Sequence, residues 1–104
     1  MSLKAKPSTY RIGLAPTSRA RCRGRCKRLI SKGELRIVIT AFVLPGRATA
    51  LSRCVRCIDG AFAKAVLAVY GCTTRIPIEP GVAEEDAVRV CQSLECCRRK
   101  ITQN

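Results

Sequence analysis

The stretch Arg19-Ala-Arg-Cys-Arg-Gly-Arg-Cys-Lys-Arg28 places two cysteines inside a run of basic residues. A second pair, Cys54 and Cys57, follows after about the length of one β-hairpin. Two close cysteine pairs separated in this way are typical of a structural zinc site, in which four thiolates surround one ion. The sequence therefore predicts that one structural Zn²⁺ organises the fold, with the ligands Cys22, Cys26, Cys54 and Cys57.

The positive charge of the chain gathers around the first cysteine pair. Of its net charge of +13, residues 1–36 contribute +10, from eleven Lys or Arg and one acid, whereas residues 37–104 contribute +3. Such a surface attracts the phosphates of nucleic acids. Arg21, Arg23 and Arg25 have a structural alternative, because four thiolates around Zn²⁺ leave a charge of −2 to be offset. Since +13 far exceeds that need, we expect the loop arginines to contact nucleic acid.

The cysteine content also bears on the compartment and the chemistry. No apolar run has the length of a signal peptide or of a transmembrane helix, so we expect a reducing compartment, no membrane partner, and cysteines that act as metal ligands. There is no histidine, and we expect no enzyme activity. The four other cysteines are expected to be small buried residues on helix faces, while a second metal site or a disulfide stays open for them: Cys72, Cys91, Cys96 and Cys97.

The local patterns predict a small α+β fold, a zinc-stabilised finger with a β-hairpin or short antiparallel sheet and two C-terminal helices. Strands are expected at 10–14, 34–43 and 47–52, with a hairpin tip at Pro45-Gly46. Asp59 can cap a helix over 60–70 that ends at Gly71. A second helix is expected over 83–97, and its expected apolar face consists of Ala87, Val88, Cys91, Leu94 and Cys97. The domain organisation that we expect is a mobile basic arm over 1–9, one domain over 10–97 and a basic tail over 98–104.

Three segments resemble the PARP-type zinc finger, which occurs in poly(ADP-ribose) polymerases and in some DNA ligases and end-processing enzymes. They are Ser18-Arg-Ala-Arg-Cys22, Ile30-Ser-Lys-Gly-Glu-Leu-Arg36 and the stretch from Ile78-Glu-Pro-Gly81 through Asp86. The resemblance covers roughly residues 10–97. The chain differs from the family in its Cys-x3-Cys first pair and in Cys54, which stands where the family has histidine. We therefore expect a divergent version with four cysteine ligands, and, with no polymerase or ligase domain attached, a stand-alone finger.

The resemblance implies a zinc-dependent module that binds damaged or broken DNA through the sugar–phosphate backbone, without reading sequence. Arg19 and Arg36 match family positions that contact phosphate. Phe42 and Leu44 correspond to the apolar loop that stacks on an exposed end base. These implications predict a nuclear protein that serves DNA repair, within a larger repair or chromatin assembly.

Two other functions are compatible with the residues. A basic four-cysteine zinc module can bind RNA, the ribosome or duplex DNA without preference for breaks. A secreted cationic peptide stapled by disulfides is the second alternative, and the missing signal sequence argues against it.

Overall fold

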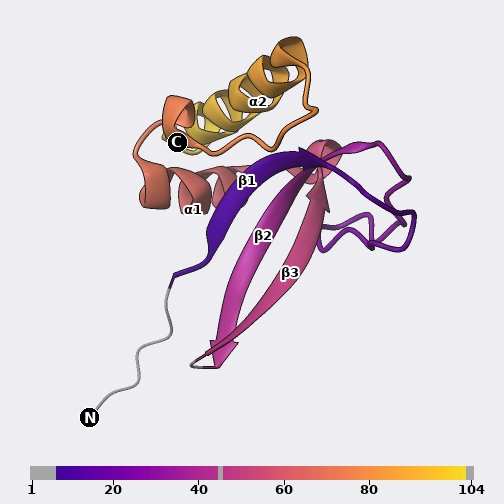
Figure 1. Cartoon of the computed structure of the whole chain (residues 1–104). Helices are drawn as coiled ribbons and strands as arrows, with labels where there is room; N and C mark the ends of the chain where they lie inside the picture. Colours follow the sequence, from indigo (N-terminus) through magenta and orange to yellow (C-terminus); the bar gives the residue numbers. More distant parts are fainter. Residues whose placement is uncertain (1–6, 45, 103–104) are drawn as a thin grey trace.

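The computed structural model describes residues 7–44 and 46–102, and their side chains except those of residues 43–44 and 99–102. Most of the expected N-terminal arm, residues 1–6, lies outside the described residues. Three antiparallel strands form one sheet in the order β1-β2-β3, and two helices pack against it (Figure 1). This arrangement confirms the small α+β fold. The strands are β1 (Thr9–Leu14), β2 (Leu35–Leu44) and β3 (Arg47–Cys54), and the helices are α1 (Gly60–Tyr70) and α2 (Glu84–Thr102).

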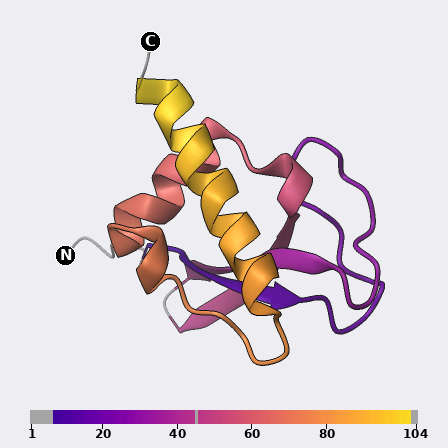
Figure 2. The same ribbon diagram turned by 90° about the horizontal axis from the view of Figure 1, so that it is seen from above.

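The central strand β2 divides its residues between two faces, as its alternation predicts. Leu35 and Ile37 are buried on the helix side, in one core cluster with Phe62 and Val66 of α1 and with Leu94 of α2. Figure 2 shows α2 lying across α1, so that the second helix closes this core from above. The other face of β2 carries Arg36, which pairs with Cys54 at the end of β3.

Helix α1 has the bounds that its sequence signals predict. Its N-cap residue Asp59 accepts a 2.8 Å hydrogen bond from the backbone N–H of Phe62. Gly71 ends the helix with φ of 83°, a left-handed conformation that glycine adopts without a steric penalty, and its N–H bonds the Leu67 carbonyl. Asp59 therefore fixes where the chain turns from the second cysteine pair into the helix.

The linker between the two helices, residues 71–83, pairs with the edge of the sheet. It contains a short 3₁₀ turn, η2 (Thr73–Arg75), and then runs beside the outer edge of β1. There the Ile12 N–H bonds the Pro77 carbonyl at 2.9 Å, and the Glu79 N–H bonds the Ile12 carbonyl at 2.8 Å. This pairing satisfies backbone groups that would otherwise remain open at the sheet edge.

Helix α2 is longer than predicted, and its predicted apolar face is confirmed at Ala87 and Leu94 but not at Val88. It extends to Thr102, past the expected end at residue 97. Val90 is fully buried, whereas Val88, which was expected in the core, is 47% exposed, so the prediction of Val88 as a core residue is wrong. The helix turns Val90 and Leu94 inward together with Ala87, a 3-4 spacing that the sheet and α1 select. Over the described residues, no helix is long and apolar enough to cross a membrane.

Candidate metal centre and its basic surround

The first cysteine pair lies on a loop that closes on itself between β1 and β2. The Cys22 N–H bonds the Arg28 carbonyl at 2.9 Å, next to an antiparallel bridge between Arg21 and Leu29. Lys27 takes the left-handed conformation, with φ of 54°, which lets the chain reverse just after Cys26. The loop also bonds to β3, because the Arg23 N–H donates to the Ser52 carbonyl at 2.8 Å.

The second pair comes from the end of β3 and from the 3₁₀ turn η1 (Val55–Cys57) that follows it. Together the two pairs place four Sγ atoms within 4.8 Å of one another, contributed by Cys22, Cys26, Cys54 and Cys57. These four cysteines can hold a metal ion, and all eight cysteines of the chain are free thiols. The second pair thus reaches the first through the hairpin, as the spacing predicts.

The distances within the cluster fit a tetrahedral ion. The Sγ atom of Cys54 lies 3.6 Å from Sγ of Cys22 and 3.6 Å from Sγ of Cys26. Sulfurs that surround Zn²⁺ tetrahedrally at about 2.3 Å are about 3.8 Å apart. A disulfide requires about 2.0 Å between its sulfurs. The spacing therefore suits four separate ligand atoms around one ion.

Backbone N–H groups point at the sulfur of Cys22. The Gly24 and Cys54 N–H groups each lie 3.3 Å from this Sγ atom, an arrangement that stabilises a thiolate. Gly24 has no room for a side chain, since an added Cβ would lie 2.4 Å from Cβ and 2.9 Å from Sγ of Cys57. The glycine within the Cys-x3-Cys loop thus lets the loop backbone approach the second cysteine pair.

The thiols of the cluster differ in how readily they ionise. The Arg28 backbone N–H, which bonds the Cys26 sulfur, is the main cause that lowers the pKa of this exposed thiol to about 6. Burial is the main cause that raises the pKa of Cys54 to about 12. A buried thiol of this kind loses its proton at neutral pH when a metal cation binds it. Cys26 therefore ionises readily without a metal, whereas Cys54 would lose its proton only when a metal ion binds it.

Two arginines that the sequence did not single out support the cysteine segments. The Arg53 guanidinium donates to the Cys57 carbonyl at 2.8 Å and lies 4.4 Å from the centre of the Phe62 ring, which fixes η1 against the core. Arg28 pairs with Glu34, which also accepts the Ser31 N–H and so closes the segment after the loop. Neither role has a sequence signal, because each depends on how the chain turns between the arginine and its partner.

The four-cysteine cluster has its own small core. Ala15, Cys22, Ile30 and Cys54 form a buried cluster separate from the helix-packed core. Cys22 and Cys54 are fully buried, whereas Cys26 faces solvent. A chain with few aromatic residues thus builds its second core around sulfur atoms.

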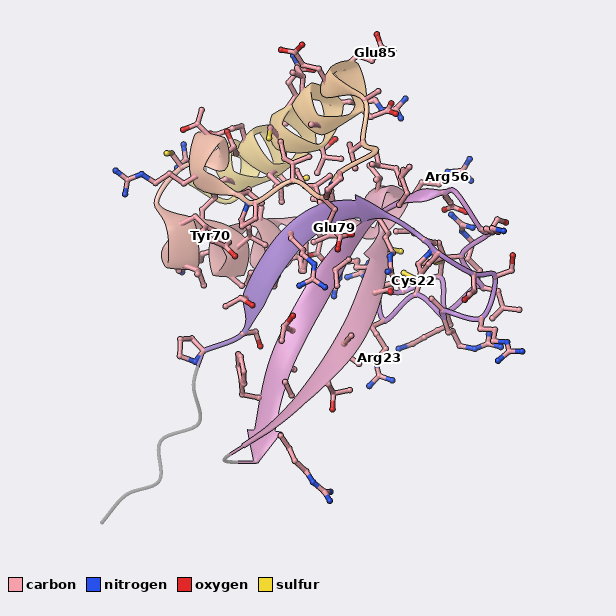
Figure 3. All side chains as sticks on the ribbon, viewed as in Figure 1. Cys22, Arg23, Arg56, Tyr70, Glu79 and Glu85 are labelled. Carbon is pink, nitrogen blue, oxygen red and sulfur yellow. The ribbon has the colours of Figure 1, made fainter. Side chains whose placement is uncertain are left out.

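The loop carries exposed cations around the cluster. Arg19, Arg23 and Arg25 are exposed and make no ion pair within the described part of the chain. Arg21 is also exposed, but its Nη1 donates to the Lys27 carbonyl at 2.7 Å and so helps to close the loop. Figure 3 shows Cys22 and Arg23 beside the sheet, away from Glu85 at the start of α2.

The other predicted contact residues lie on β2. Arg36 is half-buried and sits opposite Cys54 in the strand register, with its Nη1 bonded to the Ser52 hydroxyl. Phe42 is half-buried on the same strand face, six residues farther along. The side chain of Leu44 lies outside the described residues. Sequence reasoning missed Ser52, a buried serine that joins the cysteine loop to Arg36.

The remaining cysteines do not form a second cluster among the described residues. Cys91 and Cys97 are half-buried on α2 and donate to the carbonyls of Thr73 and Ile58, which agrees with packing on a helix face. Cys96 is exposed, contrary to that expectation, because it lies on the outer side of α2. Cys72 lies half-buried before η2, with its sulfur 3.1 Å from the Thr74 hydroxyl.

No protein-family model matches this chain, and no curated protein is significantly similar to it.

Proposed function

We propose that this chain is a zinc-dependent DNA-binding module that recognises broken or damaged DNA through its backbone phosphates. The observation that carries the proposal is the combination of a four-thiol cluster with exposed arginines on the loop that holds it. The resemblance to PARP-type fingers, on Ser18–Cys22 and Ile30–Arg36, directs the proposal toward DNA breaks.

The metal in this proposal is Zn²⁺ with a structural role. Cysteine sulfur is the donor that zinc prefers in structural sites, and four such donors leave no open position for substrate. The ligands would be Cys22, Cys26, Cys54 and Cys57. The ion would hold the basic loop against the end of β3, and the module would have no catalytic activity. Four thiolate ligands also suit iron, so metal analysis of the purified protein tests the identity of the ion.

The phosphate contacts are assigned to the exposed arginines. A guanidinium offers planar pairs of donors that match phosphate oxygens, and Arg19, Arg23 and Arg25 have no competing carboxylate among the described residues. Arg36 joins them because Ser52 orients its guanidinium beside the same loop. Contacts to phosphate alone carry no base information, so binding without sequence preference follows.

Preference for ends is assigned to the hairpin. Phe42, and Leu44 with it, would stack on a base that a break exposes, which an intact duplex does not offer. A protein of this kind acts on chromosomal DNA, so we place it in the nucleus, within a repair or chromatin assembly.

A competition experiment tests the proposal. The zinc-loaded protein is bound to a fluorescent gapped duplex and displaced by blunt-ended duplex, closed circular duplex or structured RNA at equal nucleotide concentration. We expect the gapped and blunt-ended DNA to compete best. Equal competition by all would show a general phosphate-binding module, and stronger competition by RNA would favour an RNA or ribosome partner. Either result would overturn the assignment to DNA breaks.

A further inference from the structure

Helix α2 has a second face that packs against the core only in part, through Cys91. A groove of about 1030 Å³ runs along this face, between the helix and the segment from η2 to the start of α2. Val88 and Ile78 in this groove are 47% and 51% exposed, and they are among the most exposed large apolar side chains in the described part of the chain. The lining of the groove includes Ile78, Val82, Glu84, Val88, Cys91 and Glu95.

The residues that α2 contributes follow the spacing of a helix-packing seam. Glu84, Val88, Cys91 and Glu95 are separated by four, three and four residues. This alternation keeps side chains along one stripe that faces a second helix at a shallow crossing angle. Burial raises the pKa of the Cys91 thiol, whose sulfur donates to the Thr73 carbonyl, so this position is a neutral, apolar part of the seam.

The groove differs in charge from the rest of the molecule. Among its described lining residues the only charged ones are Glu84 and Glu95, although the whole chain carries +13. Glu95 is paired with Arg98, which lies outside the groove, at 2.7 Å. The two carboxylates lie at the ends of the seam, eleven residues apart, or about 16 Å along a helix that rises 1.5 Å per residue.

The charge pattern decides which occupant fits. A nucleic acid is repelled by the carboxylates. A second copy of α2 fits less well, because parallel pairing places Glu84 against Glu84 and antiparallel pairing places it against Glu95, so neither arrangement offers Glu84 a cation from the seam. A partner helix with a cation at each end and apolar side chains between the two cations would complement the seam.

We propose that this groove binds an α-helix of a partner protein that carries Lys or Arg at two positions eleven residues apart and apolar side chains at the two seam positions between them. The apolar side chains contact Val88, Ile78 and Cys91, and the basic ones pair with Glu84 and Glu95. The groove and the four-cysteine cluster share no residue.

A synthetic peptide serves as the probe. Its sequence places Lys, Leu, Leu and Lys along one helical stripe with spacings of four, three and four, with alanine and glutamine elsewhere and a side-chain lactam on the opposite face to hold the helix. A control peptide has the same composition, with the two leucines moved to the opposite face. Binding to the zinc-loaded chain is followed by amide NMR shifts. We expect saturable shifts in residues 73–96 with the first peptide only.

Two charge reversals on the first turn of α2 provide the matched variants. Glu84→Lys changes the seam, whereas Glu85→Lys makes the same charge change one residue away, outside the groove. We expect Glu84→Lys to weaken peptide binding about tenfold or more, because it sets like charges against each other, and Glu85→Lys to have little effect. A peptide with Glu in place of the facing Lys should regain affinity for the Glu84→Lys protein.

Three results would overturn the proposal: no saturable shifts with the seam peptide, equal binding of the control peptide, or equal losses from the two reversals. General charge attraction does not explain binding, because the chain and the peptide are both cationic.

Discussion

At the scale of single residues, the packing around Gly24 limits what the metal centre tolerates. A Cβ atom at this position would lie 2.4 Å from Cβ of Cys57. We therefore predict that Gly24→Ala displaces the loop from the second cysteine pair and weakens zinc affinity by roughly 10–100-fold, the usual effect of disturbing groups next to metal ligands. Competition with a chromophoric chelator measures this affinity.

Gly33→Ala is the control for this glycine substitution. A Cβ at Gly33 meets nothing within 4 Å, but the φ of 83° strains any side chain there. This variant should lose about 1–2 kcal/mol of stability and keep its zinc affinity. Zinc affinity in Gly24→Ala equal to that of the parent chain would contradict the packing account.

Cys72 and Cys91 provide a prediction about thiol reactivity. The Thr74 hydroxyl is the main cause that lowers the pKa of Cys72, with the backbone N–H groups of Thr74 and Arg75 also contributing, while burial raises the pKa of Cys91. A lower pKa leaves more thiolate, so Cys72 should react faster with iodoacetamide near pH 7. Peptide mapping by mass spectrometry gives both rates.

The Thr74→Val variant checks the cause of this difference. It removes the hydroxyl while keeping the branched shape, so the pKa of Cys72 should rise and its alkylation near pH 7 should slow. The rate at Cys91 should not change. An unaltered rate at Cys72 would mean that the backbone groups alone set its reactivity.

At the scale of elements, the outer edge of β1 is closed by groups from distant segments. The Tyr70 hydroxyl, at the end of α1, accepts the Tyr10 N–H at 2.9 Å and donates to the Tyr10 carbonyl. Tyr70→Phe leaves both backbone groups without this partner, so we predict a loss of about 1–3 kcal/mol in the free energy of unfolding. Urea denaturation of the zinc-loaded chain measures it.

Tyr10→Phe is the matched deletion of a hydroxyl. The Tyr10 ring packs edge-on against Phe62 at 5.6 Å, and its hydroxyl has no hydrogen-bond partner among the described residues. This variant should stay close to the parent in stability. Equal losses in the two variants would show that the Tyr70 hydroxyl does not anchor β1.

The elements with local signals are those that the sequence predicts well. The helix over 60–70 has a capping Asp59 and a terminating Gly71, and its bounds agree with the structure. Leu35 and Ile37 lie on one face of β2, as the alternation of a strand requires. Cysteine spacing predicts which four thiols meet, because ligand pairs on two turns require only a hairpin between them.

The features that the sequence does not predict depend on distant contacts. Pairing of the linker with β1 rests on backbone bonds between Ile12 and Pro77 and between Glu79 and Ile12, which no residue pattern marks. The rotation of α2 follows from the surface that α1 and the sheet offer, which buries Val90 and leaves Val88 exposed. The role of Gly24 is also hidden, because it depends on where Cys57 arrives in space.

At the scale of the whole molecule, the chain separates two kinds of surface. Exposed arginines surround the thiol cluster, and an acidic, apolar groove follows α2. This separation suits a module that holds DNA with one region and a partner protein with another. The proposed phosphate contacts make the DNA affinity depend on salt, which gives a quantitative test of the basic region.

The combined variant Arg19→Ala with Arg36→Ala tests those contacts. Loss of two phosphate contacts should reduce the slope of log affinity against log salt by about 1.8, since each contact to duplex DNA contributes about 0.9. Zinc should remain bound. Lys64→Ala with Arg75→Ala removes the same charge from exposed positions outside the loop and should leave the slope nearly unchanged. Equal slopes in the two double variants would mean that residues other than Arg19 and Arg36 make the phosphate contacts.

The proposed DNA-binding surface depends on the metal, because the proposed ion holds the basic loop in place. Native mass spectrometry of the folded chain, purified without added metal, tests this directly. We predict one zinc ion per chain, all eight thiols reduced, and loss of the folded charge-state distribution when a chelator removes the ion. A folded chain with no metal and a mass lower by eight hydrogen atoms would contradict the account, because it would mean four disulfides in place of the proposed zinc centre.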